Sequence, residues 1–85
     1  MLPIQDLTLL SIEEQAEYVW ENGVFILCKP SYAYYVSLYA FSGYFAELWY
    51  DDAENQLIGI YPFADLTRLD PFLGQISLRQ LLGGK

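Results

Sequence analysis

The stretch from residue 31 to residue 61 constrains the fold more than any other part of this 85-residue chain. Aromatic and β-branched residues, which favour a pleated and partly buried surface, dominate three runs within it: 32–41, 44–50 and 56–61. Ser42 and Gly43 separate the first two runs and form a two-residue hairpin signal, in which the glycine supplies a positive φ. The acidic segment 51–55 separates the second and third runs, and its short polar side chains tolerate turn geometry. The pattern predicts an antiparallel β-meander.

The two turns also predict which residues face each other. In the first hairpin we expect one face to carry the pairs Phe41–Tyr44, Tyr39–Ala46, Ser37–Leu48 and Tyr35–Tyr50, and the other face Ala40–Phe45, Leu38–Glu47 and Val36–Trp49. In the second hairpin we expect the pairs Leu48–Ile58, Ala46–Ile60, Trp49–Leu57 and Glu47–Gly59. A slip of one residue would exchange the two faces, so both face assignments depend on this register.

A helix and a fourth strand are predicted before the meander. Ser11 and Glu14 have the spacing of a capping box, and Gly23 lies where a glycine commonly ends a helix, which predicts a helix over residues 11–22. Its apolar residues recur at helical spacing: Ile12, Ala16, Val19 and Trp20. The apolar run 24–29 predicts a strand buried on both faces. We expect the helix to cover the sheet face that carries Val36, Leu38, Ala40, Phe45 and Trp49.

Short helical turns are predicted after Pro62. Leu66 and Leu69 would face inward from residues 63–69, Asp70 and Pro71 resemble a cap followed by a first helical position, and residues 77–82 would begin a last turn. The predicted fold class is therefore α+β. One N-terminal helix packs on a four-stranded antiparallel β-meander with short C-terminal helical turns, in a single small domain over residues 1–85.

Composition excludes several classes of function. The formal net charge is −7, with 11 acidic and 4 basic residues, so we expect no nucleic-acid partner, because such binding relies on Lys and Arg. The chain has no histidine, the commonest general base and the partner of nucleophilic Ser and Cys. We expect no catalytic residues, no metal site and no cofactor. The single cysteine, Cys28, fits a reducing cytoplasm, and we expect no secretory leader and no membrane association.

The tyrosines suggest a binding surface. One helix cannot cover both faces of four strands, so the tyrosine-rich face needs a second cover, either residues 63–82 or another protein. Tyrosine suits interfaces because its ring is apolar and its tip polar. We therefore expect a small acidic, non-catalytic interaction module that forms a homodimer or binds a partner protein, as an inhibitor or immunity-type protein would. The expected contact residues are Tyr35, Tyr39, Phe41, Tyr44, Tyr50, Ile58 and Ile60.

Glu47 supports an alternative function. It lies in an aromatic and aliphatic run, and a buried carboxylate must be paired, hydrogen-bonded or protonated. One interpretation is a structural carboxylate bound to a tyrosine hydroxyl, to Arg68 or to a backbone amide. The other is a polar anchor in an apolar pocket, which would make the protein a small-ligand binding domain.

Overall fold

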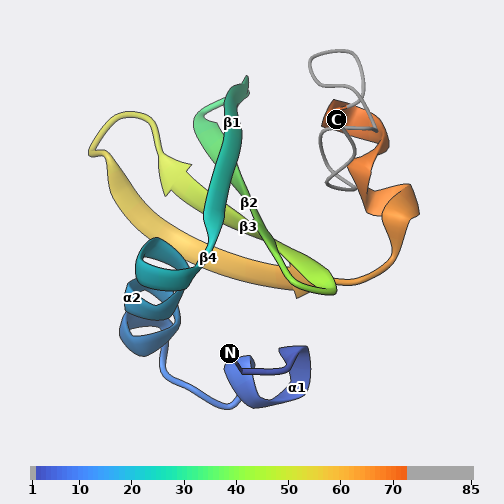
Figure 1. The fold of residues 1–85 in the computed structure, drawn as a ribbon. Coiled ribbons are helices and arrows are strands. Elements are labelled where there is room, and N and C mark those ends of the chain that lie inside the picture. The colour runs from blue at the N-terminus through green and yellow to red at the C-terminus, as the bar shows by residue number, and fades with distance from the viewer. Residues whose placement is uncertain (1, 73–85) are drawn as a thin grey trace.

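The computed structural model describes residues 2–72, and the elements run in the order α1 (Ile4–Leu7), α2 (Ile12–Asn22), β1 (Val24–Ser31), β2 (Tyr34–Phe41), β3 (Tyr44–Asp51), β4 (Gln56–Phe63) and the 3-10 helix η1 (Leu66–Phe72). The four strands form one antiparallel sheet in sequence order (Figure 1). This arrangement confirms the predicted α+β fold. The helical turn predicted over residues 77–82 lies outside the described residues. Within residues 2–72, no helix has the length and apolar character needed to cross a membrane.

The first hairpin has the predicted register. Phe41 pairs with Tyr44, and the pairing continues without interruption to Tyr34 and Asp51. Gly43 has a φ of 94°, in the region that glycine adopts at low cost. The two-residue turn therefore determines which side chains of β2 and β3 share a face.

The predicted register of the second hairpin is wrong by two residues. Leu48 pairs with Ile60 instead of Ile58, and Glu47 pairs with Tyr61 instead of Gly59. The turn is one residue shorter than the predicted segment 51–55, because Asp51 pairs with Gln56 and belongs to β3. This shifts the register by one residue, and a bulge between Trp49 and Tyr50 shifts it by one more. The bulge moves Leu57 to the face of Tyr50 and leaves Ile58 49% exposed.

The capping box of α2 is present as predicted. The Glu14 amide donates to the Ser11 hydroxyl at 3.2 Å, and the Ser11 amide donates to the Glu14 carboxylate at 3.0 Å. Gly23 ends the helix for a reason other than the predicted one, because its φ is −83° and thus not left-handed. A Cβ at Gly23 would lie 2.8 Å from the Val19 carbonyl oxygen and 3.0 Å from the Phe41 ring. Glycine is needed there because helix and sheet approach closely.

The helix α2 packs on the sheet face opposite to the predicted one. Its fully buried residue Val19 forms a core cluster with Ala46 and Leu48 on the tyrosine-rich face. Tyr18 also stacks on Phe41 with ring centroids 5.9 Å apart, whereas Trp20, which was predicted to face the sheet, is 52% exposed. Both faces are apolar, so the connection at Gly23 and the aromatic contact of Tyr18 decide which one the helix covers.

The other face of the sheet is covered from the C-terminal side. Leu69 of η1 is fully buried in a second cluster, whose other members are Val36, Leu38, Phe45 and Phe63. Figure 1 shows α2 and η1 on opposite sides of the sheet. Phe63 and Leu69 therefore do not cover the tyrosine-rich face, and residues 73–82, the rest of the expected cover 63–82, lie outside the described residues. Leu66, also predicted to face inward, is 48% exposed.

The two edge strands each contain a proline. Pro30 lies in β1 and Pro62 in β4, where the missing N–H costs little because one side of an edge strand has no neighbouring strand. The prediction that residues 24–29 are buried on both faces is wrong, since Val24 is 64% and Phe25 54% exposed. An edge strand has fewer neighbours to bury an apolar run.

Candidate functional site

The tyrosine-rich face is divided into a covered half and an open half. In the covered half, Phe41 stacks between Tyr18 and Tyr44, with ring centroids 5.9 and 4.7 Å apart. The Tyr44 side chain is buried, and its hydroxyl donates to the Leu2 carbonyl oxygen at 2.8 Å. Phe41 and Tyr44, both expected contact residues, are thus engaged by the N-terminal segment and α2.

The open half carries four aromatic side chains that we call the tyrosine band: Phe25, Tyr35, Tyr39 and Tyr50. Phe25 meets Tyr39 edge to face at 5.6 Å, and Tyr35 stacks on Tyr50 at 4.8 Å. Phe25 is exposed and the three tyrosines are half-buried. Their rings are therefore held against one another while their edges remain accessible. This geometry provides a firm, partly apolar surface with hydroxyl groups.

Two hydroxyls of the tyrosine band, those of Tyr35 and Tyr39, have a raised pKa. Desolvation by the surrounding protein, followed by proximity to Tyr50 and Cys28, raises the pKa of Tyr39 above 10.0. Desolvation and the same neighbours, together with Asp52, raise the pKa of Tyr35. An elevated pKa keeps these two phenols protonated, so they can both donate and accept hydrogen bonds. Protonated phenols of this kind are suited to hydrogen bonding with a partner.

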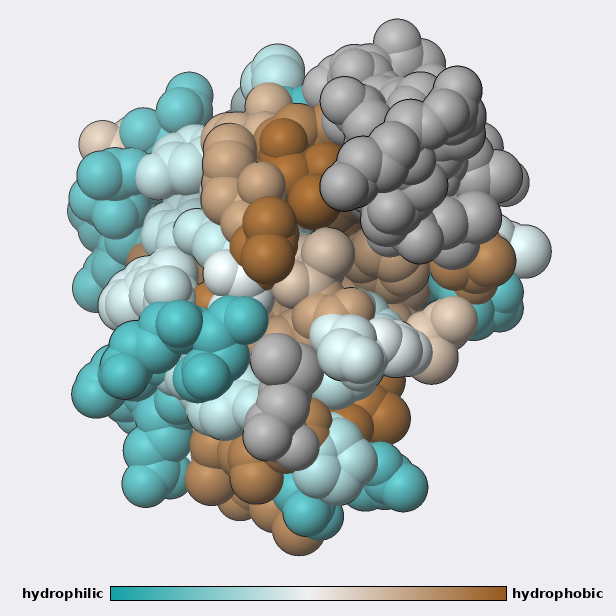
Figure 2. Space-filling view, in the orientation of Figure 1, coloured by the Kyte–Doolittle hydropathy of each residue, from teal (hydrophilic) through white to brown (hydrophobic). Residues whose placement is uncertain are grey.

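Acidic residues border the tyrosine band. The Tyr35 hydroxyl donates to the Asn55 side chain and so ties the band to the β3–β4 turn, which carries Asp52 and Glu54 and follows Asp51 at the end of β3. The exposed side of α2 adds further acids: Glu13, Glu14, Glu17 and Glu21. Figure 2 shows hydrophilic residues gathered over α2 at the lower left and hydrophobic residues through the centre of the same view. Apolar and acidic surface thus lie close together.

The predicted contact residues divide between several environments. Tyr35, Tyr39 and Tyr50 share the open half, Ile60 is half-buried against the cluster around Val19, and Ile58 is exposed at the bulge of β4. Sequence reasoning missed Phe25, because the run 24–29 was interpreted as doubly buried. Pro30 at the end of that run was the available signal, since proline within a strand indicates an edge.

Glu47 lies on the opposite face of the sheet and is 7% exposed. It pairs with Leu38 in β2, as predicted. Its Oε1 accepts from the Trp49 indole N–H at 3.0 Å and lies 3.3 Å from Nη2 of Arg68. The Arg68 guanidinium also lies over the Phe63 ring, 5.1 Å from its centroid. Arg68 was one of the partners that the sequence suggested for this carboxylate, and the ion pair supplies the partner that a buried carboxylate needs.

A hollow of about 290 Å³ lies beside this carboxylate, lined by Glu47, Trp49, Tyr61 and Arg68. Tyr61 reaches the hollow because Gly59 leaves room for its ring. A Cβ on Gly59 would lie 2.9 Å from ring and hydroxyl atoms of Tyr61. Two aromatic rings, a carboxylate and a guanidinium therefore meet at one place on this face.

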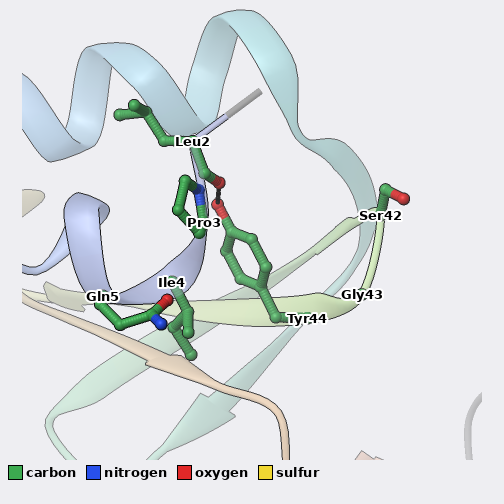
Figure 3. Close-up of a pocket in the computed structure, with 7 residues that line it drawn as sticks. All are labelled: Leu2, Pro3, Ile4, Gln5, Ser42, Gly43 and Tyr44. Carbon is green, nitrogen blue, oxygen red and sulfur yellow. Dashed lines mark hydrogen bonds between the residues drawn. The ribbon is translucent and has the colours of Figure 1, made fainter.

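A second hollow of about 380 Å³ lies between the N-terminal segment and the β2–β3 turn, lined by Leu2, Pro3, Ile4, Gln5, Ser42, Gly43 and Tyr44. Figure 3 shows the Tyr44 side chain reaching from β3 to the Leu2 backbone. The Tyr44 hydroxyl is therefore already committed to the chain itself. The other described residues that line this hollow carry no charged side chain.

Comparison with protein-family models, with curated proteins and with solved structures found no match for this chain.

Proposed function

We propose that the protein is a small acidic, non-catalytic interaction module that binds a partner protein through the tyrosine band. The observation that carries this proposal is the open half of the tyrosine-rich face. Phe25 is 54% exposed there beside three half-buried tyrosines, and α2 leaves all four accessible. Stacked tyrosines offer a large contact area at low conformational cost, as protein interfaces require.

Charge favours a basic partner over a second copy of the chain. The net charge is −7, and the band is bordered by the acidic β3–β4 turn. In a homodimer built through this face, two acidic borders would approach each other. A basic protein would instead be attracted to the acidic border before contact. Such a protein would operate in the cytoplasm, in keeping with its single unpaired cysteine.

Site-specific photo-crosslinking tests the proposal. A benzophenone side chain introduced at Tyr39, in native cells, is expected to form a covalent adduct with a basic protein. The matched control is the same side chain at Tyr61, which is 52% exposed on the opposite face of the sheet. Adducts from Tyr61 but not from Tyr39 would contradict the proposal. An adduct of twice the chain mass, formed by the purified protein alone, would favour the homodimer.

A small-ligand binding function is a second candidate, with Glu47 as its polar anchor. The observation that favours this function is the hollow of about 290 Å³ beside Glu47, because a purely structural ion pair does not require such a space. Replacement of Glu47 by Gln keeps the shape of the side chain and removes its charge. If this change alters stability alone and leaves every ligand interaction unchanged, the anchor role fails.

A further inference from the structure

The hollow beside Glu47 presents both hydrogen-bond acceptors and donors. Among residues 2–72, both contacts of the Glu47 carboxylate use Oε1, so Oε2 keeps its capacity to accept. Arg68 contacts Glu47 through Nη2, its side chain is 49% exposed, and a guanidinium has five N–H donors. A ligand that donates to Glu47 and accepts from Arg68 at adjacent atoms would therefore satisfy both groups.

The two aromatic side chains that line this shallow hollow favour a flat ligand. The Trp49 indole is oriented by its hydrogen bond to Glu47 and by an edge contact with Tyr34, whose ring centroid is 6.2 Å away. The Tyr61 ring lies over Gly59, where a side chain would collide with it. Aromatic faces of this kind stack on planar heteroaromatic rings, whatever the identity of the ring.

Size and charge narrow the ligand further. A volume of about 290 Å³ is at the lower end of small-molecule sites, which suits one compact ring system and not an extended cofactor. The net charge of −7 repels phosphorylated compounds. The ligand should therefore be small, planar and uncharged.

From these three properties we infer that the hollow binds neutral planar heteroaromatic compounds whose edge carries a hydrogen-bond donor beside an acceptor. This inference rests on the second candidate function, a small-ligand site anchored by Glu47. Guanosine has the required edge, since its O6 acceptor adjoins the N1–H donor. Arg is a common partner of the guanine acceptors, and carboxylates accept from base N–H groups.

The test is a titration of the full chain with guanosine, followed through the two indole N–H signals in nitrogen–proton correlation NMR spectra. The Trp49 indole N–H donates to Glu47 inside the site, and the Trp20 indole lies on α2 at 52% exposure as an internal reference. Guanosine is expected to shift the Trp49 signal saturably and to leave the Trp20 signal in place. Purine riboside has the same rings without the exocyclic groups. It should bind about tenfold more weakly, because Glu47 and Arg68 would be left without hydrogen-bond partners on the ligand.

Two variants and one charged probe complete the design. Glu47→Gln and Arg68→Lys should each weaken guanosine binding about tenfold, because each removes part of the paired recognition. Arg68→Lys serves as the safeguard if Glu47→Gln fails to fold, since Arg68 is half exposed. Guanosine monophosphate should bind more weakly than guanosine because of the negative net charge.

The outcomes separate the inference from the function on which it rests. If purine riboside shifts the Trp49 signal as strongly as guanosine, the hollow binds aromatic rings without recognising their edge. The inference on ligand class then fails and the small-ligand function stands. If neither probe moves the Trp49 signal, or if the Trp20 signal moves with it, both the inference and the small-ligand function are overturned.

Discussion

Leu2 is held in place by two hydrogen bonds of its backbone. The Leu2 amide donates to the Tyr18 hydroxyl, and the Leu2 carbonyl accepts from the Tyr44 hydroxyl at 2.8 Å. Both rings belong to one stack, with Phe41 between them. Two tyrosine hydroxyls from distant parts of the chain therefore place the N-terminal segment against the sheet.

Replacement of Tyr44 by Phe tests this attachment. The change keeps the ring stack but leaves the Leu2 carbonyl without its donor, which should lower the free energy of unfolding by about 1–2 kcal/mol. Urea denaturation measures the difference. Tyr32→Phe is the matched control, because that side chain is fully exposed and its loss should leave the midpoint unchanged. Equal effects of both changes would mean that the hydroxyl of Tyr44 contributes nothing specific.

The same residue predicts a dependence on alkaline pH. Desolvation, followed by the nearby Tyr18 hydroxyl, raises the pKa of Tyr44 above its ordinary 10.0. Because the folded state favours the protonated form, the stabilisation is fully present below pH 10.0 and is lost as the pH rises through the folded-state pKa. Urea midpoints from about pH 8 to about pH 11 should fall more steeply for the native protein than for Tyr44→Phe. Parallel curves would exclude a contribution from Tyr44.

At the scale of the elements, the two hairpins differ in how much the sequence determines them. Ser42 and Gly43 allow only a short turn, so the register of β2 against β3 follows directly and was predicted correctly. The segment 51–55 is compatible with turns of different length. The bulge near Ile58 shifts the register further, and no local pattern in the sequence records it.

The Gly43 turn provides a test of the first hairpin. A Cβ at Gly43 would have no neighbouring atom within 4 Å, so Gly43→Ala changes backbone strain and not packing. At a φ of 94° the change should cost about 1–2 kcal/mol in unfolding free energy. Gly43→Asn should cost less, because asparagine tolerates positive φ better than alanine. Thermal denaturation of both variants measures the difference. A larger loss of stability for Gly43→Asn than for Gly43→Ala would refute the explanation by backbone strain.

In the candidate sites, too, some features follow from the local sequence, whereas others depend on how the whole sheet is assembled. The pairing of Glu47 with Leu38 followed from the first turn, and Arg68 was among the partners expected for its carboxylate. The face covered by α2 could not be predicted, since both faces are apolar and the choice depends on the close approach at Gly23. The exposure of Phe25 depends on β1 being an edge strand, a property of the whole sheet.

At the scale of the whole molecule, one sheet separates two core clusters. The cluster of Val19, Ala46 and Leu48 lies under α2, and Leu69 of η1 belongs to the cluster on the other face. Each cover is short, with 11 residues in α2 and 7 in η1, and the two clusters share no member among the side chains that the structure describes. The free energy of unfolding should therefore contain two independent contributions, one from each cluster, which are coupled only through the strands.

A double-mutant cycle tests this separation. Val19→Ala should cost about 1–3 kcal/mol and Leu69→Ala about 2–5 kcal/mol, since both side chains are fully buried. Because the residues lie on opposite faces, the double variant should equal the sum within about 0.5 kcal/mol. Val19→Ala with Leu48→Ala is the matched control, because these residues share one cluster and should couple more strongly. Urea denaturation in sucrose keeps the double variants folded enough to measure. A coupling between Val19 and Leu69 as large as that between Val19 and Leu48 would mean that the sheet transmits strain from one cluster to the other, and that the two faces form a single cooperative core.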